Sequence, residues 1–157
     1  MVIQKSSTKT ALELDNFESL VDKRLNSIFQ KLIKNQTTID ESISYALSNP
    51  GKRIRPTLVF LVGDFLGIEA SRLESVAGAI ELIHTYSLVH DDLPCMDDDD
   101  LRRGKPTLHK KFNESTAVLT GDALQTLAFN LILEDKNLDS NEKQELLSDL
   151  AKRIGPE

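Results

Sequence analysis

The chain has 157 residues, with 19 Lys and Arg against 25 Asp and Glu, which gives a formal net charge of −6. This acidic balance argues against nucleic acid or an anionic membrane as the main partner. The longest apolar run, 58–62, is far shorter than the roughly 18 residues of a membrane-spanning helix. A single cysteine, Cys95, excludes an internal disulfide framework and a Cys-based zinc site. Since the N-terminus also has no signal-peptide pattern, we expect a cytoplasmic protein.

Apolar residues recur at three- and four-residue steps along most of the chain, which is the period of a helix with one buried face. Two stretches of capping-box form, Thr38–Glu41 and Ser71–Glu74, indicate helix starts, and Pro50-Gly51 indicates a helix end. Strand-type alternation is absent, so the prediction is an all-α protein. In chain order we expect a mobile tail over 1–14, helices over 17–33, 38–47, 57–66, 73–92, 117–133 and 142–154, and a turn-rich loop over 97–115.

The most informative segment carries six carboxylates within ten residues, at Asp91, Asp92 and 97–100. Two such charges about 5 Å apart repel by roughly 3 kcal/mol at an effective dielectric constant near 20, so the cluster is unstable unless cations lie near it. Carboxylate oxygens without thiolate ligands suit magnesium. A calcium loop starting at Asp97 is rejected, because Arg102 stands where that loop needs glycine. A solvated acidic loop remains the alternative.

Helix geometry places Asp91 on the same face as His84 and Ser87. On an ideal helix Asp97 would point roughly 120° away from Asp91. Pro94 forbids an undisturbed helix between them, so a local bulge can return Asp97 to the side of Asp91. We therefore predict that these two carboxylates converge on one magnesium ion.

A second cluster, Gly51–Arg55, places three cations in a turn just before the expected helix at Pro56. Free N–H groups, the helix dipole and guanidinium forks at such a turn all favour a diphosphate. A cationic surface turn is the alternative interpretation of this cluster alone. Together with the carboxylates and Arg102-Arg103, the pattern indicates two bound diphosphates, one held through metal and one through cations.

With these residues in view, the sequence resembles the trans-type polyprenyl diphosphate synthases, and within them the bacterial farnesyl diphosphate synthases (geranyltranstransferases). The matching stretches are GKRIRP at 51–56, ELIHTYSLVHDDLPCMDDDDLRRGKPTLHKKF at 81–112 and LTGDALQTLAF at 119–129. The resemblance implies the isoprenoid synthase fold, in which helices surround a central cavity, and a homodimer. It also implies a magnesium-assisted prenyltransferase that joins isopentenyl diphosphate to an allylic diphosphate (dimethylallyl or geranyl), giving farnesyl diphosphate.

The resemblance also assigns roles to residues of this sequence. Asp91 and Asp97 would hold magnesium, with Asp92 and Asp98 as possible support, and Arg102 would hold the allylic diphosphate. Tyr86 and Ser87 would limit the length of the product. The residues implied for isopentenyl diphosphate are Lys52, Arg55, His84 and Arg103, with Gly51 beside them.

The sequence also departs from the family pattern. Family members are nearly twice this length and carry a second aspartate-rich motif, which does not occur after Asp100 here. We therefore expect residues 15–157 to be the N-terminal half of the synthase domain and the chain alone to be inactive. The alternatives are a geranylgeranyl diphosphate synthase, a non-catalytic synthase-like partner subunit, and an acidic helical interaction module.

Overall fold

The computed structural model describes residues 3–33, 37–49 and 51–156, with side chains from Phe17 onward. Pro50, the expected helix stop, lies outside the described residues. The described chain is almost entirely helical, so the all-α prediction is confirmed. Its elements are α1 (Ile3–Leu32), α2 (Thr38–Leu47), α3 (Ile54–Phe65), the 3-10 turn η1 (Ala70–Arg72), α4 (Glu74–Asp91), β1 (Leu101–Arg102), β2 (Lys105–Pro106), α5 (Leu108–Lys111), α6 (Glu114–Leu133) and α7 (Ser140–Ile154).

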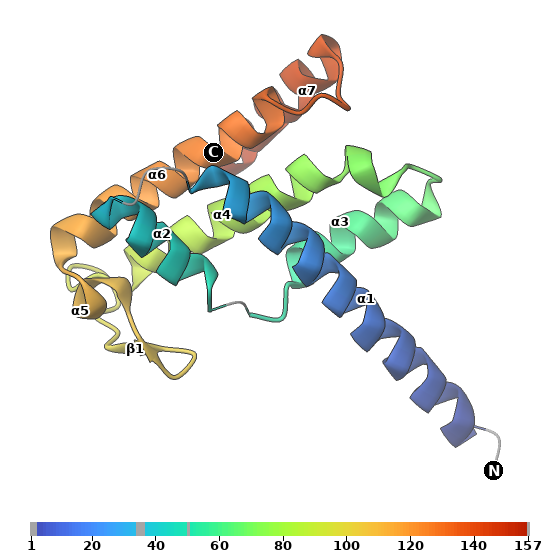
Figure 1. The fold of residues 1–157 in the computed structure, drawn as a ribbon, viewed down its shortest axis with the longest axis horizontal. Coiled ribbons are helices and arrows are strands. Elements are labelled where there is room, and N and C mark those ends of the chain that lie inside the picture. Colours follow the sequence, from blue (N-terminus) through green and yellow to red (C-terminus); the bar gives the residue numbers. More distant parts are fainter. Residues whose placement is uncertain (1–2, 34–36, 50, 157) are drawn as a thin grey trace.

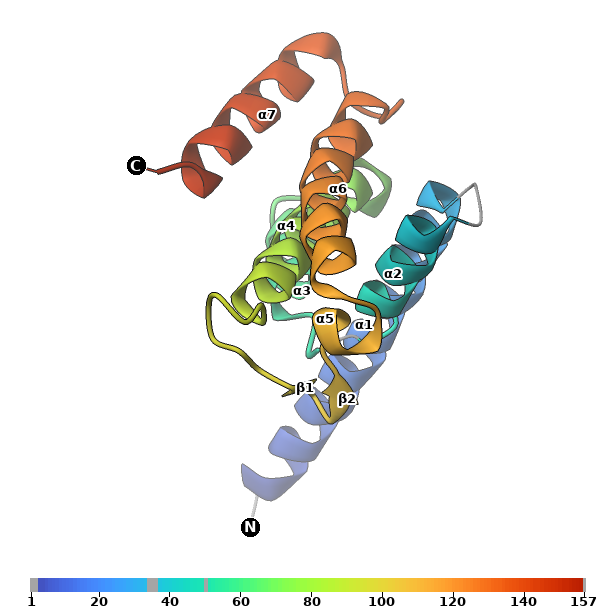
Figure 2. The ribbon, with the colours of Figure 1, turned by 90° about the vertical axis from the view of Figure 1, so that its left-hand side faces the viewer.

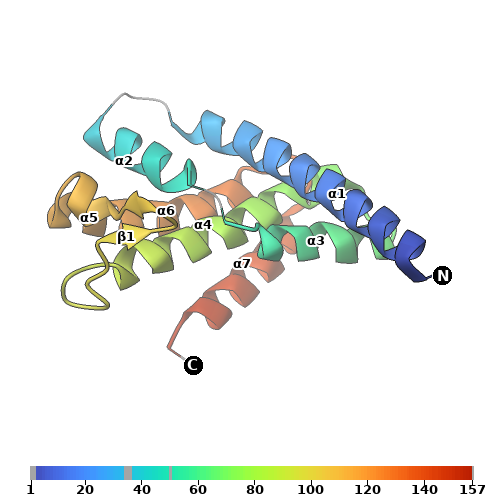
Figure 3. The same ribbon diagram turned by 90° about the horizontal axis from the view of Figure 1, so that it is seen from below.

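The centre of the bundle is the pair of α4 and α6, which make the most extensive helix–helix contact. Small buried residues such as Ala77, Gly78 and Gly121 let the two backbones approach closely, and Leu82 and Leu124 between them are fully buried. Figure 3 shows α1 and α2 on one side of this pair and α7 on the other. The faces of α4 that point to the α2–α3 turn and to α7 therefore remain available for a site.

The first helix begins earlier than the sequence pattern predicted. Apolar periodicity starts at Phe17, whereas the backbone of α1 is helical from Ile3 and extends past the other helices (Figure 1). No glycine or proline interrupts residues 1–33, and Lys, Gln, Ala and Leu favour the helix without needing a buried face. The expected tail is thus helical in its backbone, while the division into tail and body stays a prediction.

The predicted helix caps are partly wrong. The box that opens α2 lies one residue earlier, between Thr37 and Asp40, with the Asp40 N–H donating to Thr37 Oγ1 over 3.2 Å. The second predicted box does not form, because Ser71 lies in η1 and α4 begins without a side-chain cap. A box at Asp139 opens α7 instead. Motif spacing alone does not fix which of several polar residues takes the extended backbone of a cap.

Within the described residues, one helix, α6, has the length and mean hydropathy of a membrane span. The sequence test for continuous apolar runs did not detect it, because polar residues are spread along it. Of its most apolar stretch, 39% is buried inside the bundle, and core helices of soluble proteins meet the same criterion. Its composition is explained by its packing on α4.

Helix α7 is attached mainly at its N-terminal end. Arg72 forms an ion pair with Glu142, and Asn137 Nδ2 donates to the Ser71 carbonyl over 3.1 Å. None of the residues of α7 is buried, and Figure 2 shows the helix leaning away from α4 and α6. A groove of about 460 Å³ consequently lies between α4 and α7.

Candidate functional site

The turn between α2 and α3, one face of α4 and the tip of the β-hairpin enclose a cationic hollow of about 520 Å³, here called the anion pocket. Three separate segments contribute to it, so the residues meet only in the folded chain. Its lining includes all five residues expected to hold or flank isopentenyl diphosphate, namely Gly51, Lys52, Arg55, His84 and Arg103.

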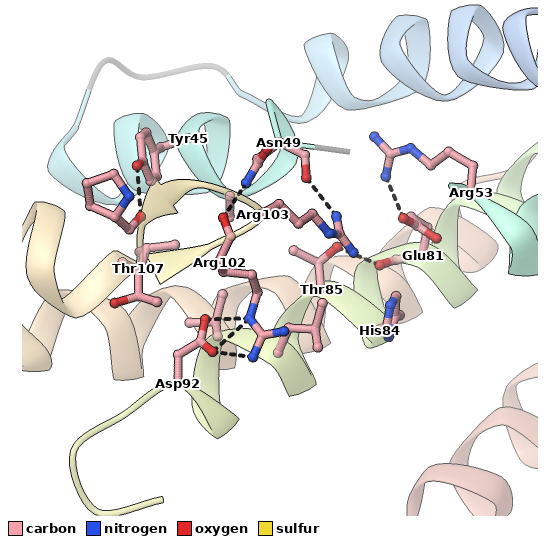
Figure 4. Close-up of a pocket in the computed structure, with 15 residues that line it drawn as sticks. Tyr45, Asn49, Arg53, Glu81, His84, Thr85, Asp92, Arg102, Arg103 and Thr107 are labelled. Carbon is pink, nitrogen blue, oxygen red and sulfur yellow. Dashed lines mark hydrogen bonds and ion pairs between the residues drawn. The ribbon is translucent and has the colours of Figure 1, made fainter. Parts of the chain in front are cut away.

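The three cations of the turn do not act alike. Lys52 and Arg55 are exposed, whereas the Arg53 side chain is only 4% exposed and its Nη1 lies 2.5 Å from Glu81 Oε1 (Figure 4). The sequence pattern groups the three cations into one cluster, because it does not show which way each side chain points. The structure leaves Lys52 and Arg55 to face a ligand.

Arg103 closes the pocket from the hairpin side. Its Nη1 donates to the Asn49 carbonyl over 2.7 Å, and its guanidinium lies against Gly51. A Cβ at residue 51 would be 2.5 Å from Arg103 Nη2, so any side chain there must displace the arginine. Gly51 therefore makes room for a protein cation, a role that the sequence did not predict.

His84 lies at the junction of the anion pocket and the groove beside α7. Burial lowers the pKa of its imidazole, and the charges of Arg55, Arg103 and Arg102 lower it further, while Glu81 raises it. The ring is therefore neutral near pH 7 and can donate one hydrogen bond to an anion. A bound anion would offset the arginine charges and raise this pKa.

The hairpin directs the side chains of two adjacent arginines to different parts of the molecule. Arg103 and Gly104, with φ of 52° and 77°, form its two-residue turn, and Arg102 pairs with Lys105 across the strands. The Asn49 side chain donates to the Arg102 carbonyl over 3.0 Å, and the Tyr45 hydroxyl donates to the Pro106 carbonyl over 2.8 Å. These bonds hold the hairpin against α2.

Neither anchor of the hairpin was singled out in the sequence. Strands of two residues carry too little alternation to be detected, and the segment was expected to be a loop. The Arg103-Gly104 pair at the turn was the feature of the sequence from which a hairpin could have been predicted.

Three of the six clustered carboxylates are paired with cations. Arg102 Nε donates to both Asp92 oxygens, over 2.7 and 2.9 Å, and its Nη2 lies 3.4 Å from Asp99 Oδ2. Lys110 Nζ lies 2.8 Å from Asp100 Oδ1, and this contact lowers the pKa of the Asp100 carboxyl. Within the described residues, Asp91, Asp97 and Asp98 have no cation at ion-pair distance.

The sequence predicted that Pro94 causes a bulge in a helix that continues past it. This prediction is wrong, because α4 ends at Asp91. The Asp97 N–H then donates to the Asp91 carbonyl over 2.8 Å, and the Asp98 N–H donates to the Leu93 carbonyl over 3.1 Å. This turn brings the backbone of Asp97 against the end of α4. The convergence of the Asp91 and Asp97 side chains on one magnesium ion stays a prediction.

The donor set fits a magnesium ion held jointly with a substrate. The described residues contain no group of three or more His, Cys, Asp or Glu placed to hold a metal. Magnesium in phosphate-transfer sites commonly takes one or two carboxylates plus waters and substrate phosphates. Asp91 and Asp97, which form no ion pair among the described residues, are suited to this role.

The predicted product-length residues lie in different surroundings. Ser87 and His84 line the groove between α4 and α7, together with apolar residues such as Ile83 and Leu150. Tyr86 instead packs its ring edge-on to His90, with centroids 5.5 Å apart.

Three further polar residues, near the end of α4 and on α6, lie outside the two hollows. His90 Nε2 lies 3.0 Å from the Val118 carbonyl, and Asp122 Oδ1 lies 4.0 Å from the same ring nitrogen. Cys95 is exposed on the turn after α4. His90 therefore fixes α4 against α6.

A family model described as polyprenyl synthetase matches residues 36–155. The chain is 44% identical to the farnesyl diphosphate synthase of Haemophilus influenzae over 91% of this chain and 48% of that protein. It is 43% identical to geranylgeranyl pyrophosphate synthase 11 of Arabidopsis thaliana over 89% of this chain and 41% of that protein. The crystal structure of a geranyltransferase from Legionella pneumophila superposes with a TM-score of 0.89 at 39% identity, over 96% of this chain and 53% of that chain. The chain thus spans about half the length of the relatives that it matches.

Proposed function

This chain belongs to the polyprenyl synthetase family, and on that basis we propose that it supplies the diphosphate-binding wall of a prenyltransferase. The reaction would join isopentenyl diphosphate to dimethylallyl or geranyl diphosphate and give farnesyl diphosphate. The observation that carries the proposal is the convergence of Lys52, Arg55, His84 and Arg103 on one hollow. Its residues come from three segments, so a chance surface patch of cations is a poor explanation.

In the proposed reaction the C–O bond of the allylic diphosphate breaks, a C–C bond forms to isopentenyl diphosphate, and one proton is lost. The double bond of isopentenyl diphosphate is the nucleophile and released diphosphate is the proposed proton acceptor, so the protein needs to supply neither a nucleophile nor a general base. Lys52, Arg55 and Arg103 would hold isopentenyl diphosphate so that its double bond faces the electron-poor carbon, which is catalysis by positioning. Arg102, whose pKa is raised mainly by its hydrogen bond to Asp92 and also by the charge of Asp91, would stabilise the departing diphosphate.

Magnesium is the proposed cofactor, with Asp91 and Asp97 as its protein ligands. When bound, the ion would add positive charge at the leaving diphosphate. The part of this chain is to present two carboxylates that no neighbouring cation neutralises. Arg102 keeps Asp92 and Asp99 occupied, which leaves Asp91 and Asp97 for the metal.

Binding of isopentenyl diphosphate to the purified chain tests the anion pocket. We expect Lys52→Ala and Arg55→Ala each to weaken binding about tenfold or more, because a hydrogen bond to a charged group contributes about 1.5–3 kcal/mol. Isothermal titration calorimetry measures the affinities. Lys31→Ala, which removes an exposed cation from the end of α1, is the matched control and should bind as the wild type does. A wild-type chain that shows no binding would end the proposal.

We also propose that Tyr86 and Ser87 of α4 limit the chain length of the product. Replacing Tyr86 by Ala removes the large ring five residues before Asp91, so longer products are expected from an active protein that carries the change. Ser87→Phe should shorten the products, because Ser87 lines the groove between α4 and α7. Chromatography of the products measures both effects, and an unchanged product distribution in both variants would contradict the assignment.

A geranylgeranyl product is a second candidate, since the Arabidopsis geranylgeranyl pyrophosphate synthase is nearly as similar to this chain as the bacterial farnesyl diphosphate synthases. Tyr86 favours the shorter farnesyl product. The product chromatography above separates the two.

We also propose that the protein acts in the cytoplasm as a homodimer. Support for association comes from α3, whose exposed apolar face includes Leu58 (55%), Val62 (55%) and Phe65 (88%). A continuous apolar stripe on a helix marks a surface that another element covers. We expect the sedimentation coefficient of the chain to rise with its concentration and Phe65→Glu to abolish the rise, whereas Glu18→Gln should not.

A further inference from the structure

The ion pair between Arg53 and Glu81 forms part of the wall of the anion pocket, yet neither residue belongs to the proposed substrate contacts. Both side chains are 4% exposed, and the contact of 2.5 Å joins the α2–α3 turn to α4. Burying two charges removes their hydration, and this loss is offset only by close pairing and further hydrogen bonds. A pair of this kind holds its two elements in one relative position.

The other two nitrogens of the Arg53 guanidinium also have protein partners. Its Nε lies 3.0 Å from Asp22 Oδ1 in α1, and its Nη2 lies 3.4 Å from the Leu47 carbonyl at the end of α2. The guanidinium also lies over the Phe29 ring, 5.9 Å from its centroid. Arg53 therefore connects three helices, and each of its three nitrogens is hydrogen-bonded inside the protein.

The backbone conformation of Arg53 indicates that its buried contacts hold the α2–α3 turn in place. Arg53 has the left-handed conformation, with φ of 48° and ψ of 32°, which is unfavourable for a residue with a side chain. Its side chain points to Glu81 (Figure 4), while Lys52 and Arg55 are exposed and line the anion pocket. Because the buried Arg53 lies between them in the chain, its contacts limit how far the turn that carries Lys52 and Arg55 can move.

The charge of Glu81 gives the pair a second consequence. Glu81 lines the same hollow as Lys52, Arg55 and His84, so an unpaired carboxylate there would repel a diphosphate. Pairing with Arg53 removes most of this repulsion.

We propose that the Arg53–Glu81 pair is a positioning device for the anion pocket, which fixes the turn of Lys52 and Arg55 against α4 and neutralises Glu81. The inference rests on the proposed function, because the diphosphate is the anion that the turn would meet. Arg53 and Glu81 are positioning residues and do not touch the ligand.

Three variants test the pair with isopentenyl diphosphate as the probe. Arg53→Met leaves Glu81 unpaired, and we expect binding to weaken about 30-fold or more. The double variant Arg53→Met/Glu81→Leu removes both charges, so the melting temperature should recover toward the wild-type value while binding stays about tenfold weaker. Arg24→Met is the matched control: it breaks the Arg24–Glu74 pair, which also joins α1 to α4 but is one-third exposed and lies away from the pocket. Its affinity should remain that of the wild type.

The pKa of His84, followed by NMR, gives a readout that a purely structural pair would not move. The charged groups around the ring are Arg55, Arg102, Arg103 and Glu81. In Arg53→Met the unpaired Glu81 should raise the pKa of His84, whereas Arg24→Met should leave it unchanged.

If the methionine variants do not fold, Arg53→Lys keeps the charge and loses the fork, and about threefold weaker binding is expected with the fold retained. Wild-type affinity in a folded double variant or in Arg53→Lys would overturn the inference about the Arg53–Glu81 pair and leave the proposed function in place. A wild-type chain that binds no isopentenyl diphosphate would instead overturn the proposed function, and the inference with it.

Discussion

Asp91→Asn is expected to lower prenyl transfer about 100-fold or more without changing the fold. The change removes one negative charge at nearly constant shape. Because no cation of the described chain is paired with Asp91, its charge is available for a metal, and its loss leaves the departing diphosphate less stabilised. Turnover is measured on this chain fused to the C-terminal half of the Haemophilus influenzae farnesyl diphosphate synthase, because the chain spans about half the length of that relative.

Asp64→Asn is the matched control for this experiment. Asp64 is exposed near the end of α3, is not part of any ion pair among the described residues, and lines neither the anion pocket nor the groove between α4 and α7. Its turnover should stay within about threefold of the wild type, because an exposed charge away from a site contributes little. On the unfused chain, binding of dimethylallyl diphosphate should gain from magnesium in the wild type and in Asp64→Asn only. Equal magnesium enhancement in Asp91→Asn would rule out its role as a ligand.

Gly121→Ala is expected to destabilise the fold by about 1–2 kcal/mol, although alanine is the better helix former. A Cβ at residue 121 would lie 2.0 Å from His90 Nε2, so α6 and α4 must separate or the ring must leave the Val118 carbonyl. Overpacking costs about 1–3 kcal/mol, and so short a contact belongs in the upper half of that range, about 2–3 kcal/mol, against a gain of about 1 kcal/mol in helix propensity. The midpoint of urea unfolding measures the difference.

Gly78→Ala is the matched control on α4. There the added Cβ meets a Leu131 methyl group at 2.7 Å, which is the end of a side chain that can rotate away. The gain in helix propensity should then offset most of the crowding, leaving the stability within about 0.5 kcal/mol of the wild type. A Gly121→Ala protein at least as stable as Gly78→Ala would show that the contact with His90 does not limit the helix spacing.

The sequence predicted the helical class and most helix positions because the apolar period of α1, α2 and α7 is strong and no strand-type alternation occurs. The cations at 51–55 indicated an anion site, and the resemblance to the polyprenyl diphosphate synthases added His84 and Arg103, but neither pointed to Glu81, which also lines the pocket. These features depend on local pattern, which a sequence displays directly.

The sequence could not separate Arg53 from its neighbours, because the partner that turns it inward is 28 residues away in α4. The hairpin was missed for a similar reason, since it is held by Tyr45 and Asn49 of distant segments. The early start of α1 follows helix propensity, which apolar periodicity does not report. In each case a long-range contact or a weak local preference, absent from any periodic pattern, decided the outcome.

The two-residue turn at Arg103 and Gly104 has a consequence for how this protein can vary. Arg102, just before the turn, reaches toward the end of α4, and Arg103, in the turn, reaches toward the α2–α3 turn. The length of the turn therefore sets the distance between the two proposed diphosphate sites. A single insertion would rotate one arginine out of place while leaving its chemical identity intact. Loop length is therefore constrained here as strictly as residue type.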